Sequence, residues 1–514
     1  MNRTRERWAS RTSFILAAIG SAVGLGNAWR FPGLAAKHGG GAFLFAYFVL
    51  LLAVGAPILM AEVAVGRRMR HGAAGAMRGI HPRAEGIGWA ETANAFIVSV
   101  YYAVIFAWVI LMTVFSYRFA AMTGDGEAAA GVFQSITRSS GTTAGFTPIS
   151  VPVLIALLAA WILIYCSIRN GTNSMGKVVK VTVFFPVVAL AILAVRSLFL
   201  PGAWAGVKAF FIPDFRAFLD LGLWIDAVGQ VFYSLSVMMA VMFAYGSLLD
   251  DRANVAADAL IITVSDFAVS LLAGVVLFST LYGTGMTAAD LTGSGVRTAF
   301  LVYPTAIVHL SGSGVLNALF AALFYLSLCT LAIDSAFSMV EGVAVSLSDR
   351  FLWDKKRTTF AVTLAAAALS LLYIGGSGEA LVDLTDHYLN AINLIFVGFL
   401  ETAAIGWFFP TRYILWEVNR NTGRAKMPRW WFLTSLRVLA PLLLLLFFGW
   451  NLTGLIRSGG IWGGESGYSL VANLLFGWSL PVLMLFACLF FPYFVRRFGR
   501  GEPSLSERIA EDND

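Results

Sequence analysis

Long apolar segments, separated by short polar ones, recur along the whole chain. Each runs for roughly 17 to 25 residues, the length that a helix needs to cross a hydrocarbon core about 30 Å thick, and about twelve can be counted. The expected helices begin near Phe14, Ala42, Trp89, Val151, Lys180, Leu223, Ala256, Gly314, Phe360, Tyr388, Phe432 and Leu470. The alternating short segments typical of a transmembrane barrel do not occur. The pattern therefore predicts an all-α polytopic membrane protein.

The composition agrees with this pattern. Of the 514 residues, 58% are hydrophobic and 13% are charged, and the mean hydropathy is +0.77. Such a chain is too apolar for a soluble domain. The first apolar segment is longer than a signal peptide, so we expect it to remain as a helix. The three cysteines lie inside apolar segments at no metal-ligand spacing, which favours a packing role.

The positions of the basic residues matter more than the net charge of +7. Basic clusters occupy residues 3–11, 67–70, 177–180, 355–357, 412–429 and 496–497. With an even number of spans these clusters fall on one side of the membrane, so the positive-inside rule places both termini in the cytoplasm. We interpret the clusters as topology signals rather than as a nucleic-acid surface.

The first apolar segment is interrupted at mid-depth by "GSAVGLGNAWRFP", residues 20–32. Inside lipid, non-helical backbone survives only where protein or a water-filled cavity surrounds it. A break near Gly24 therefore predicts a site where carbonyls hold a cation and amides hold an anion. The alternative is that the glycines only permit close helix packing.

A second interruption occurs in the sixth segment, "GQVFYSLSVMMAVMFAYG", residues 229–246. Each interrupted segment opens a block of about five spans, which is the pattern of an inverted-repeat transporter. We expect a first repeat over residues 1–200, a second over 201–410, and two further helices with a cytoplasmic tail over 411–514. Identity between the two blocks is too faint to demonstrate the repeat directly.

Two carboxylates lie inside predicted spans, Asp266 in "TVSDFAVSLLAG" and Asp334 in "LCTLAIDSAF". A charge at this depth is unfavourable unless it is paired or binds a cation, so each residue is a site candidate. The alternative is a neutral aspartic acid that is hydrogen-bonded to a neighbouring helix. We interpret His387, at a span end, as an interfacial residue.

Together these segments resemble the neurotransmitter:sodium symporter family, and in particular its prokaryotic amino-acid transporters, over nearly the whole chain. The motifs that carry the resemblance are "RERWASRTSFILAAIGSAVGLGNAWRFP", "KHGGGAFLFAYF", the pair Tyr101-Tyr102, "PDF", "WIDAVGQVFYSLS" and "LAIDSAF". The resemblance implies five-plus-five inverted helices with helices 1 and 6 unwound, in a bacterial inner membrane. It implies no nucleic-acid partner and no required oligomer.

The resemblance also implies two sodium sites built from oxygen ligands. The first would use Ala22, Asn27, Ser234 and Asp266, together with the carboxylate of the substrate. The second would use the carbonyls of Gly20, Val23 and Leu331 and the side chains of Asp334 and Ser335. A sodium ion and a substrate carboxylate that lie side by side stabilise each other's burial, so their affinities must be coupled reciprocally.

The implied substrate is a zwitterionic amino acid, because Gly24 stands where monoamine carriers of the family place an aspartate. The implied pocket residues are Ala22, Gly24, Leu25, Gly26, Val98, Tyr102, Tyr233, Ser234, Ser236, Met238, Met239, Ser335 and Met339. The Tyr102 hydroxyl would hold the carboxylate. Tyr101 and Met238 also suit helix interfaces, which we favour for Tyr101. A small or medium aliphatic side chain is preferred, and an aromatic one remains open.

The resemblance further implies two gates and a chloride-binding region. Arg30 and Asp386 would close the outer gate, and Arg5, held by Trp8, would pair with Asp349 inside. Leu248 replaces an inner-gate tyrosine of the relatives. The chloride site of other members corresponds to Tyr47, Gln230, Ser234, Asp266 and Ser270. Because Asp266 brings a fixed negative charge, we expect chloride independence, with Asp266 a candidate to cycle a proton.

The expected function is therefore sodium-coupled symport of a neutral amino acid. A sensor that binds the amino acid without moving it is the alternative. An enzyme is not expected, because the sequence has no paired metal-binding histidines and no serine-histidine combination at matching depth. The glycine-rich stretches "GSGVRTAF" and "IGGSGEA" follow no strand and make poor phosphate loops.

Overall fold

The computed structural model describes residues 6–143, 149–285, 296, 298–423, 426–464 and 467–498. This part of the chain is almost entirely helical. The first block contains α1 (Arg11–Ala22), η1 (Gly26–Arg30), α2 (Phe31–Lys37), α3 (Gly41–Leu50), η2 (Leu51–Gly55), α4 (Ala56–Met69), α5 (Ala73–Ile80), η3 (Pro82–Ala84), α6 (Glu85–Val114), η4 (Phe115–Met122), α7 (Gly126–Thr137), α8 (Val151–Ile168), α9 (Thr172–Thr182) and α10 (Phe184–Leu198).

The second block and the last two membrane-spanning segments are also helical. Their helices are α11 (Ala203–Phe211), η5 (Phe215–Leu219), α12 (Leu221–Ser234), α13 (Val241–Ser247), α14 (Val255–Gly283), η7 (Thr298–Val302), α16 (Tyr303–Ile307), α17 (Gly314–Phe351), α18 (Lys355–Ser370), η8 (Leu371–Tyr373), α19 (Gly378–Tyr388), η9 (Leu389–Leu394), α20 (Ile395–Ala403), η10 (Ala404–Phe408), α21 (Thr411–Asn419), α22 (Arg429–Thr434), η11 (Ser435–Leu439), α23 (Ala440–Arg457), α24 (Leu470–Ala472), η13 (Asn473–Trp478) and α25 (Ser479–Phe498).

Among the described residues, nine helices are long and apolar enough to cross a membrane. The count becomes ten if the first interrupted segment is one span, in which α1 and the helix Gly26–Lys37 meet at 47°. The other two expected spans are helical but do not qualify alone. The sixth is divided into α12 and α13, of 14 and 7 residues, and the ninth is α18, of 16 residues.

The break in the sixth span is a stretch of strained backbone between α12 and α13. Ser236, Met238 and Ala240 have φ angles of 51°, 63° and 61°, in the left-handed region that side chains other than glycine rarely adopt. Such strain persists only where the surrounding structure fixes it, and it is common at functional sites. Both predicted interruptions are therefore present.

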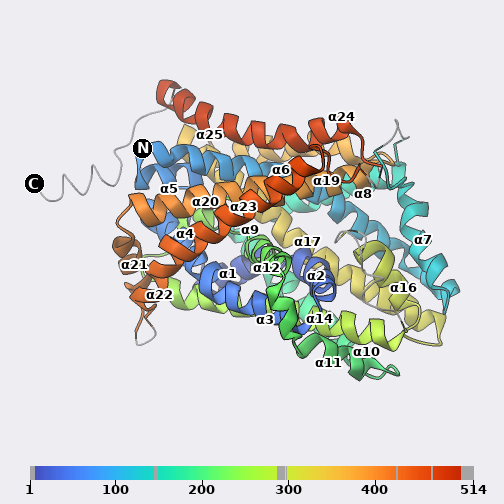
Figure 1. Cartoon of the computed structure of the whole chain (residues 1–514). Helices are drawn as coiled ribbons and strands as arrows, with labels where there is room; N and C mark the ends of the chain where they lie inside the picture. Colours follow the sequence, from blue (N-terminus) through green and yellow to red (C-terminus); the bar gives the residue numbers. More distant parts are fainter. Residues whose placement is uncertain are drawn as a thin grey trace, which may run out of the picture.

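The long helices run roughly alongside one another across the view of Figure 1. The helices α5, α21 and α22 lie at one end of the bundle, and α7 and α16 lie at the other. Inside the bundle, α6 packs along α17, α4 packs on α13, and α14 packs on α10 and α11. These contacts surround the two interruptions with protein on all sides.

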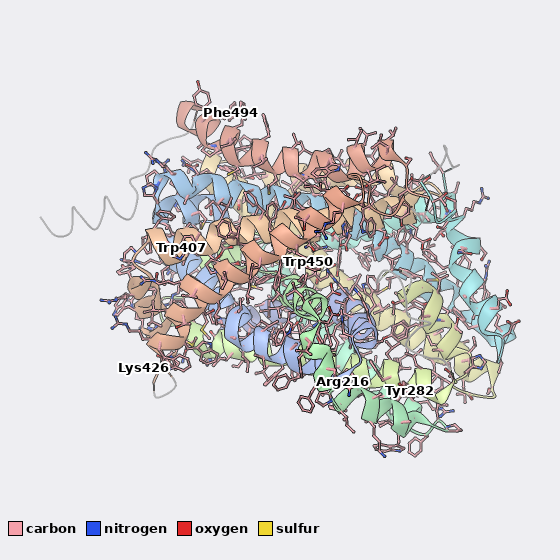
Figure 2. The ribbon with its side chains drawn as sticks, in the orientation of Figure 1. Arg216, Tyr282, Trp407, Lys426, Trp450 and Phe494 are labelled. Atoms are coloured by element: carbon pink, nitrogen blue, oxygen red, sulfur yellow. The ribbon has the colours of Figure 1, made fainter. Side chains whose placement is uncertain are left out.

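The outside of the bundle is apolar. Trp450, Leu489 and Tyr493 have exposed fractions of 54%, 75% and 62%, and Figure 2 places Trp450 and Phe494 on outer faces of the helices. Outer apolar faces of this kind are typical of helices in contact with lipid. Together with the span count, they identify a multi-pass membrane protein.

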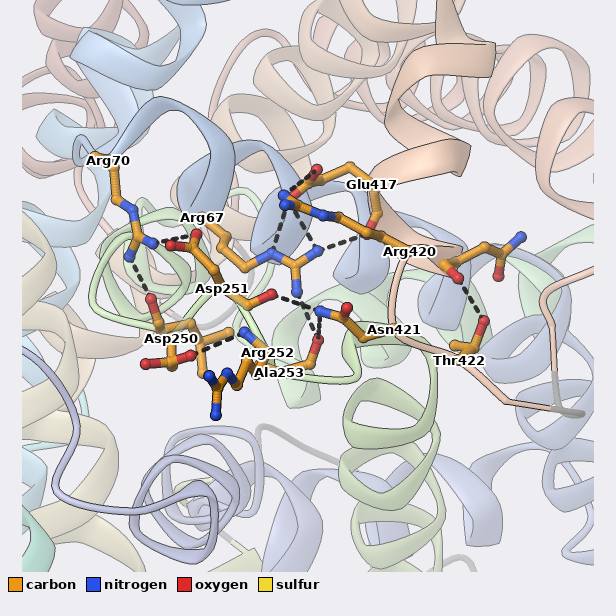
Figure 3. A network of polar contacts seen from close by, with 12 residues as sticks. Arg67, Arg70, Asp250, Asp251, Arg252, Ala253, Glu417, Arg420, Asn421 and Thr422 are labelled. Carbon is orange, nitrogen blue, oxygen red and sulfur yellow. Dashed lines mark hydrogen bonds and ion pairs between the residues drawn. The ribbon is translucent and has the colours of Figure 1, made fainter.

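Residues from two of the basic clusters, 67–70 and 412–429, meet in a single polar network, shown in Figure 3. The Arg67 guanidinium at the end of α4 is buried and pairs with Glu417 of α21 at 2.8 Å. It also donates to the carbonyl of Ala253 at 2.6 Å. Arg70 pairs with Asp251 at 2.5 Å. The network ties the end of the second span to the connection after α13 and to α21.

Candidate functional site

The backbone amides of the first interruption are bound by one side chain of the same segment and by one from α6. The amide of Gly24 donates to Oδ1 of Asn27 at 3.0 Å, and the amide of Leu25 donates to the Tyr102 hydroxyl of α6 at 3.3 Å. A Cβ at position 24 would lie 2.5 Å from Oγ of Ser335. Glycine is required here because the backbone lies directly against α17.

A small cavity of about 20 Å³ lies between the two interruptions. It is lined by Ser21, Ala22, Gly24, Leu25, Gly26, Asn27, Val98, Tyr102, Tyr233, Ser234, Ser236, Met239, Ser335 and Met339. Every residue expected in the substrate pocket is among them except Met238. The cavity has room for about one water molecule, so a larger ligand requires the lining side chains to move. Met239 and Met339 are suited to this because methionine is flexible.

The expectation for Met238 is wrong for this conformation. Its left-handed φ of 63° turns the residue away from the cavity, and its side chain packs against Gly398 of α20. Its amide donates to Oε1 of Glu62 at 2.7 Å. Met238 therefore fills a helix interface, which was the alternative left open by the sequence.

Asp266 of α14 lies at the centre of a closed hydrogen-bond network. Its Oδ1 accepts from Nδ2 of Asn27 at 2.7 Å. Its Oδ2 accepts from the Tyr47 hydroxyl at 2.6 Å and from the Ser234 hydroxyl at 2.9 Å. Nδ2 of Asn27 also donates to Oγ of Ser270 at 2.8 Å. The network joins both interrupted spans to α3 and α14, and the aspartate itself is fully buried.

Gln230 of α12 completes this group on the outer side. Its Nε2 donates to the carbonyl of Gly26 at 3.2 Å, while its buried Oε1 has no hydrogen-bond partner among the described residues. The residues expected around a former chloride site therefore lie together, and Asp266 stands among their donors as the fixed negative charge.

Asp334 of α17 has a more open environment. The Thr182 hydroxyl at the end of α9 lies 2.7 Å from both of its carboxylate oxygens. A Cβ at Gly20 would lie 2.5 Å from Oδ2 of Asp334, so the backbone of α1 is in close contact with this carboxylate. A cavity of about 360 Å³ is lined by Gly20, Val23, Thr182, Leu331 and Asp334, among others.

Ser335, expected as a ligand beside Asp334, points to the other cavity. Its hydroxyl donates to the carbonyl of Ser21 at 3.2 Å. The same carbonyl accepts from the Ser236 hydroxyl at 2.8 Å. This carbonyl, freed by the end of α1, thus joins α17 to the second interruption. The remaining four residues expected at the second cation site line one cavity.

The expected outer pair of Arg30 and Asp386 is not formed. Both residues line an outer cavity of about 630 Å³, but Arg30 lies over the ring of Tyr233, 4.8 Å from its centre. Asp386 instead accepts from the Tyr101 hydroxyl at 2.7 Å and from Nδ2 of Asn390 at 2.8 Å. Tyr101, expected to fill a helix interface, therefore holds a gate residue.

Arg5, which was expected at the inner gate, lies outside the described residues. Trp8 donates from its indole to the carbonyl of Tyr245 at 3.1 Å, and Asp349 accepts from the amide of Gly72 at 3.0 Å. The arm before α1 is also held by Glu6, which pairs with Lys355 at 2.6 Å. Burial alone raises the pKa of Glu6, but Lys355 and the bonds from Thr172 outweigh it and lower the pKa.

Several polar residues of this region escaped the sequence analysis. Thr182 gave no signal, because a hydroxyl in an apolar run is common, and Tyr101 was expected only to fill a helix interface. Three glutamates did give one, since Glu62, Glu91 and Glu401 interrupt the apolar stretches "ILMAEVAV", "WAETANAF" and "FLETAAIG". The rule that identified Asp266 and Asp334 applies to them equally.

Chemically, the two interruptions present carbonyl, hydroxyl and carboxylate oxygens around small buried cavities. Oxygen ligands suit hard cations. The amide of Leu25 and the hydroxyl of Tyr102 add hydrogen-bond donors that suit an organic anion. The arrangement therefore fits a metal cation and a carboxylate that bind next to each other.

Comparison with known proteins supplies the family context. A model of the sodium:neurotransmitter symporter family matches residues 5–124 and 133–495. An uncharacterized sodium-dependent transporter of Methanocaldococcus jannaschii is 31% identical over 436 residues, covering 83% of this chain and 86% of the relative. The sodium- and chloride-dependent taurine transporter of Bos taurus is 31% identical over 447 residues, covering 79% of this chain and 72% of the relative.

Among solved structures, the crystal structure of MhsT in complex with L-phenylalanine is similar in fold. The TM-score is 0.74 and the sequence identity is 27%, with 86% of this chain and 99% of the MhsT chain covered. The likeness therefore extends over most of the chain.

Proposed function

The chain belongs to the sodium:neurotransmitter symporter family, and from that premise we propose that it moves a neutral, zwitterionic amino acid into the cell together with sodium by alternating access. Membership makes it a sodium-dependent membrane symporter of a family of transporters. The substrate class, the number of sodium sites and the role of chloride are the parts proposed here.

The observation that carries the substrate class is the arrangement at Gly24. The absence of a side chain there leaves the amide of Leu25 and the hydroxyl of Tyr102 next to the cavity, among its other polar groups. A substrate carboxylate suits these donors, whereas an acidic side chain at position 24 would repel it. The MhsT structure holds L-phenylalanine, which supports an amino acid as the class of ligand.

The side chain of the substrate is proposed to be small or medium in size and aliphatic. Met239 and Met339 line the cavity and adapt their shape to the ligand. A cavity of about 20 Å³ holds about one water molecule in this conformation, so the lining side chains must move for any amino acid, and a smaller substrate side chain requires less movement. An aromatic substrate such as the ligand of MhsT is therefore the competing outcome of a substrate screen.

Two sodium sites are proposed. The first uses the carbonyl of Ala22 with Asn27, Ser234 and Asp266, and the substrate carboxylate completes it. The second uses the carbonyls of Gly20, Val23 and Leu331 with Asp334, and Ser335 joins it after rotation of its hydroxyl. Because the first site shares a ligand with the substrate, binding of either one strengthens binding of the other by the same factor.

Chloride independence is proposed from the charge of Asp266. Three donors surround this carboxylate at 2.6–2.9 Å, where a chloride-dependent protein needs an anion from solution. The taurine transporter of Bos taurus is chloride-dependent by name, so family membership does not decide the matter. Uptake that collapses when gluconate replaces chloride would contradict the proposal.

The orientation is proposed from the basic clusters. Residues of the clusters at 67–70 and 412–429 lie in one polar network in Figure 3, and α21 lies at one end of the bundle in Figure 1. By the positive-inside rule this end faces the cytoplasm, with both termini, in the inner membrane of a bacterium. The site lies within one chain, so transport requires no second copy.

Uptake by purified protein in proteoliposomes tests the function. An inward sodium gradient is imposed, and a panel of radiolabelled amino acids is supplied, with choline in place of sodium as the control. Accumulation of a neutral amino acid above its outside concentration is expected only with sodium. Sodium-dependent binding without accumulation would favour the alternative of a membrane sensor.

A further inference from the structure

Three carboxylates are buried in the bundle outside the site described above. Glu62 of α4, Glu91 of α6 and Glu401 of α20 each have an exposed fraction of 0%. They come from three different helices that meet at the unwound segment: the amide of Met238 donates to Glu62, and the side chain of Met238 packs against Gly398, one turn before Glu401. The amide of Ala240, in the same segment, faces Glu91. Such a group of like charges inside a membrane protein requires compensation.

Hydrogen bonds provide almost no compensation for these three carboxylates. Oε1 of Glu62 accepts from the amide of Met238 at 2.7 Å. The other five carboxylate oxygens of the three residues are buried and have no hydrogen-bond partner among the described residues. The amide of Ala240 faces Glu91 but does not reach hydrogen-bond geometry.

Cations do not compensate for them either, which sets these residues apart from other buried glutamates. Glu85, Glu341 and Glu417 are just as buried, and each is paired: with Arg350 at 2.7 Å, with Lys355 at 2.5 Å and with Arg67 at 2.8 Å. Within the described ranges, none of Glu62, Glu91 and Glu401 forms an ion pair. Figure 3 shows the ion pair between Glu417 and Arg67 for comparison.

Among the described residues, several buried or half-buried cations of the bundle are already paired with other carboxylates: Arg78 and Arg350 with Glu85, Arg67 with Glu417, and Arg11 with Asp258. The other titratable groups near the three glutamates are Tyr245 of α13 and Cys488 of α25, and the polar side chains of Asn94 and Asn393 link α6 to η9. None of these carries a positive charge.

A shared metal ion does not fit the geometry. In the part of the chain that the structure describes, no group of three His, Cys, Asp or Glu side chains is placed to hold one. Protons are then the remaining way to neutralise the charge, since each carboxyl group can take its own. Glu62, which accepts a backbone amide, suits the ionised form, so Glu91 and Glu401 are the residues left to carry protons.

We propose that Glu62, Glu91 and Glu401 form a proton-binding site, separate from the sodium and substrate sites, that is protonated at neutral pH and is linked to the unwound segment between α12 and α13. The link is the bond from the amide of Met238 to Glu62. Met238 and Ala240 adopt strained left-handed conformations on either side of Met239, which lines the substrate cavity. Loss of a proton puts a second negative charge beside Glu62 and disturbs this segment.

Infrared spectroscopy of the purified full chain tests proton occupancy directly. Protein with ¹³C-labelled glutamate at neutral pH is expected to show the carbonyl stretch of protonated glutamic acid, because an exposed glutamate is ionised there. Glu91→Gln and Glu401→Gln are each expected to remove part of this band. Glu127→Gln, at an exposed position, is the matched control and leaves it unchanged.

The wild-type spectrum alone keeps the proposal falsifiable if a variant does not fold. No glutamic acid band at neutral pH, or a band that both variants leave intact, overturns it. The measurement needs no transport, so it remains valid if the proposed amino-acid symport fails. If the symport holds, sodium-driven uptake is expected to decline at alkaline pH in the wild type and to decline less in Glu91→Gln.

Discussion

Asp266 and Asp334 are both aspartates buried at mid-span, yet their surroundings differ sharply. Three side-chain donors from three different segments satisfy the carboxylate of Asp266. The carboxylate of Asp334 has the single hydroxyl of Thr182, and it lines a cavity of about 360 Å³. The hydrogen-bonding positions of Asp266 are largely occupied by protein donors. Asp334 keeps most of its carboxylate lone pairs available for a ligand.

The difference indicates how strongly each of the two carboxylates depends on a bound sodium ion. Donors that already point at Asp266 stabilise its charge with little dependence on a cation. At that site, sodium is favoured mainly when the substrate carboxylate arrives as a further ligand. Asp334 has no such support, so the stability of its charge depends on the cation itself. We therefore expect substitutions at Asp334 to have the larger effect on sodium binding.

The largest expected effect is that of Asp334→Ala. It removes the charged ligand of the second site, and a loss of about 3 kcal/mol corresponds to roughly 100-fold weaker sodium activation. Sodium-driven uptake into proteoliposomes measures it. Thr182→Ala, which removes only the hydroxyl beside Asp334, is the control and is expected to have a much smaller effect. Full sodium-driven uptake by Asp334→Ala would remove the second site.

The next effect is that of Asp266→Asn. The amide retains the shape of the network but loses its charge, so we expect about 2 kcal/mol, or roughly 30-fold, weaker activation by sodium in chloride-free buffer. Chloride is expected to restore part of this loss in the variant and to change nothing in the wild type. Uptake by the variant is measured in chloride and in gluconate. Equal rates in the two buffers would contradict the argument that the charge of Asp266 replaces that of chloride.

Two glycines offer a matched pair that separates the sites. A Cβ at Gly20 would lie 2.5 Å from Asp334, and a Cβ at Gly24 would lie 2.5 Å from Ser335. Crowding of this kind costs about 1.4 kcal/mol or more, roughly tenfold in affinity. We expect Gly20→Ala to raise the sodium concentration for half-maximal uptake, and Gly24→Ala to weaken binding of the amino acid. The same change in both parameters for both variants would argue against separate sites.

The smallest expected effect is that of Tyr47→Phe. It removes one of three donors to Asp266, and the remaining two still hold the carboxylate. The loss of one such bond is worth about 1 kcal/mol, or roughly fivefold in sodium affinity. Equilibrium binding of labelled amino acid at several sodium concentrations measures it. An effect as large as that of Asp334→Ala would show that the network around Asp266 is not redundant.

The sequence was informative where a residue's role follows from its depth. The two interruptions and the two aspartates were predicted because breaks and charges in an apolar run are rare and have few physical explanations. The neighbours of Asp266 followed from the family resemblance. Glu62, Glu91 and Glu401 were equally accessible to this reasoning and were missed.

The remaining features depend on conformation, which sequence patterns do not encode. Met238 points away from the cavity because its backbone is left-handed, and unwound segments have no periodicity from which a direction follows. Arg30 and Asp386 line one cavity without pairing, because a sequence pattern does not fix how far apart two side chains lie in a given conformation. Thr182 is recognisable only once α9 lies beside α17.

The central claim is that an amino acid and sodium bind side by side and share a ligand. Equilibrium binding of the preferred amino acid to purified protein, titrated over a series of sodium concentrations with choline as the balancing cation, tests it most directly. We predict that the affinity for the amino acid rises with sodium, and that the amino acid raises the affinity for sodium by the same factor. Amino-acid binding of equal strength in sodium and in choline would contradict the account.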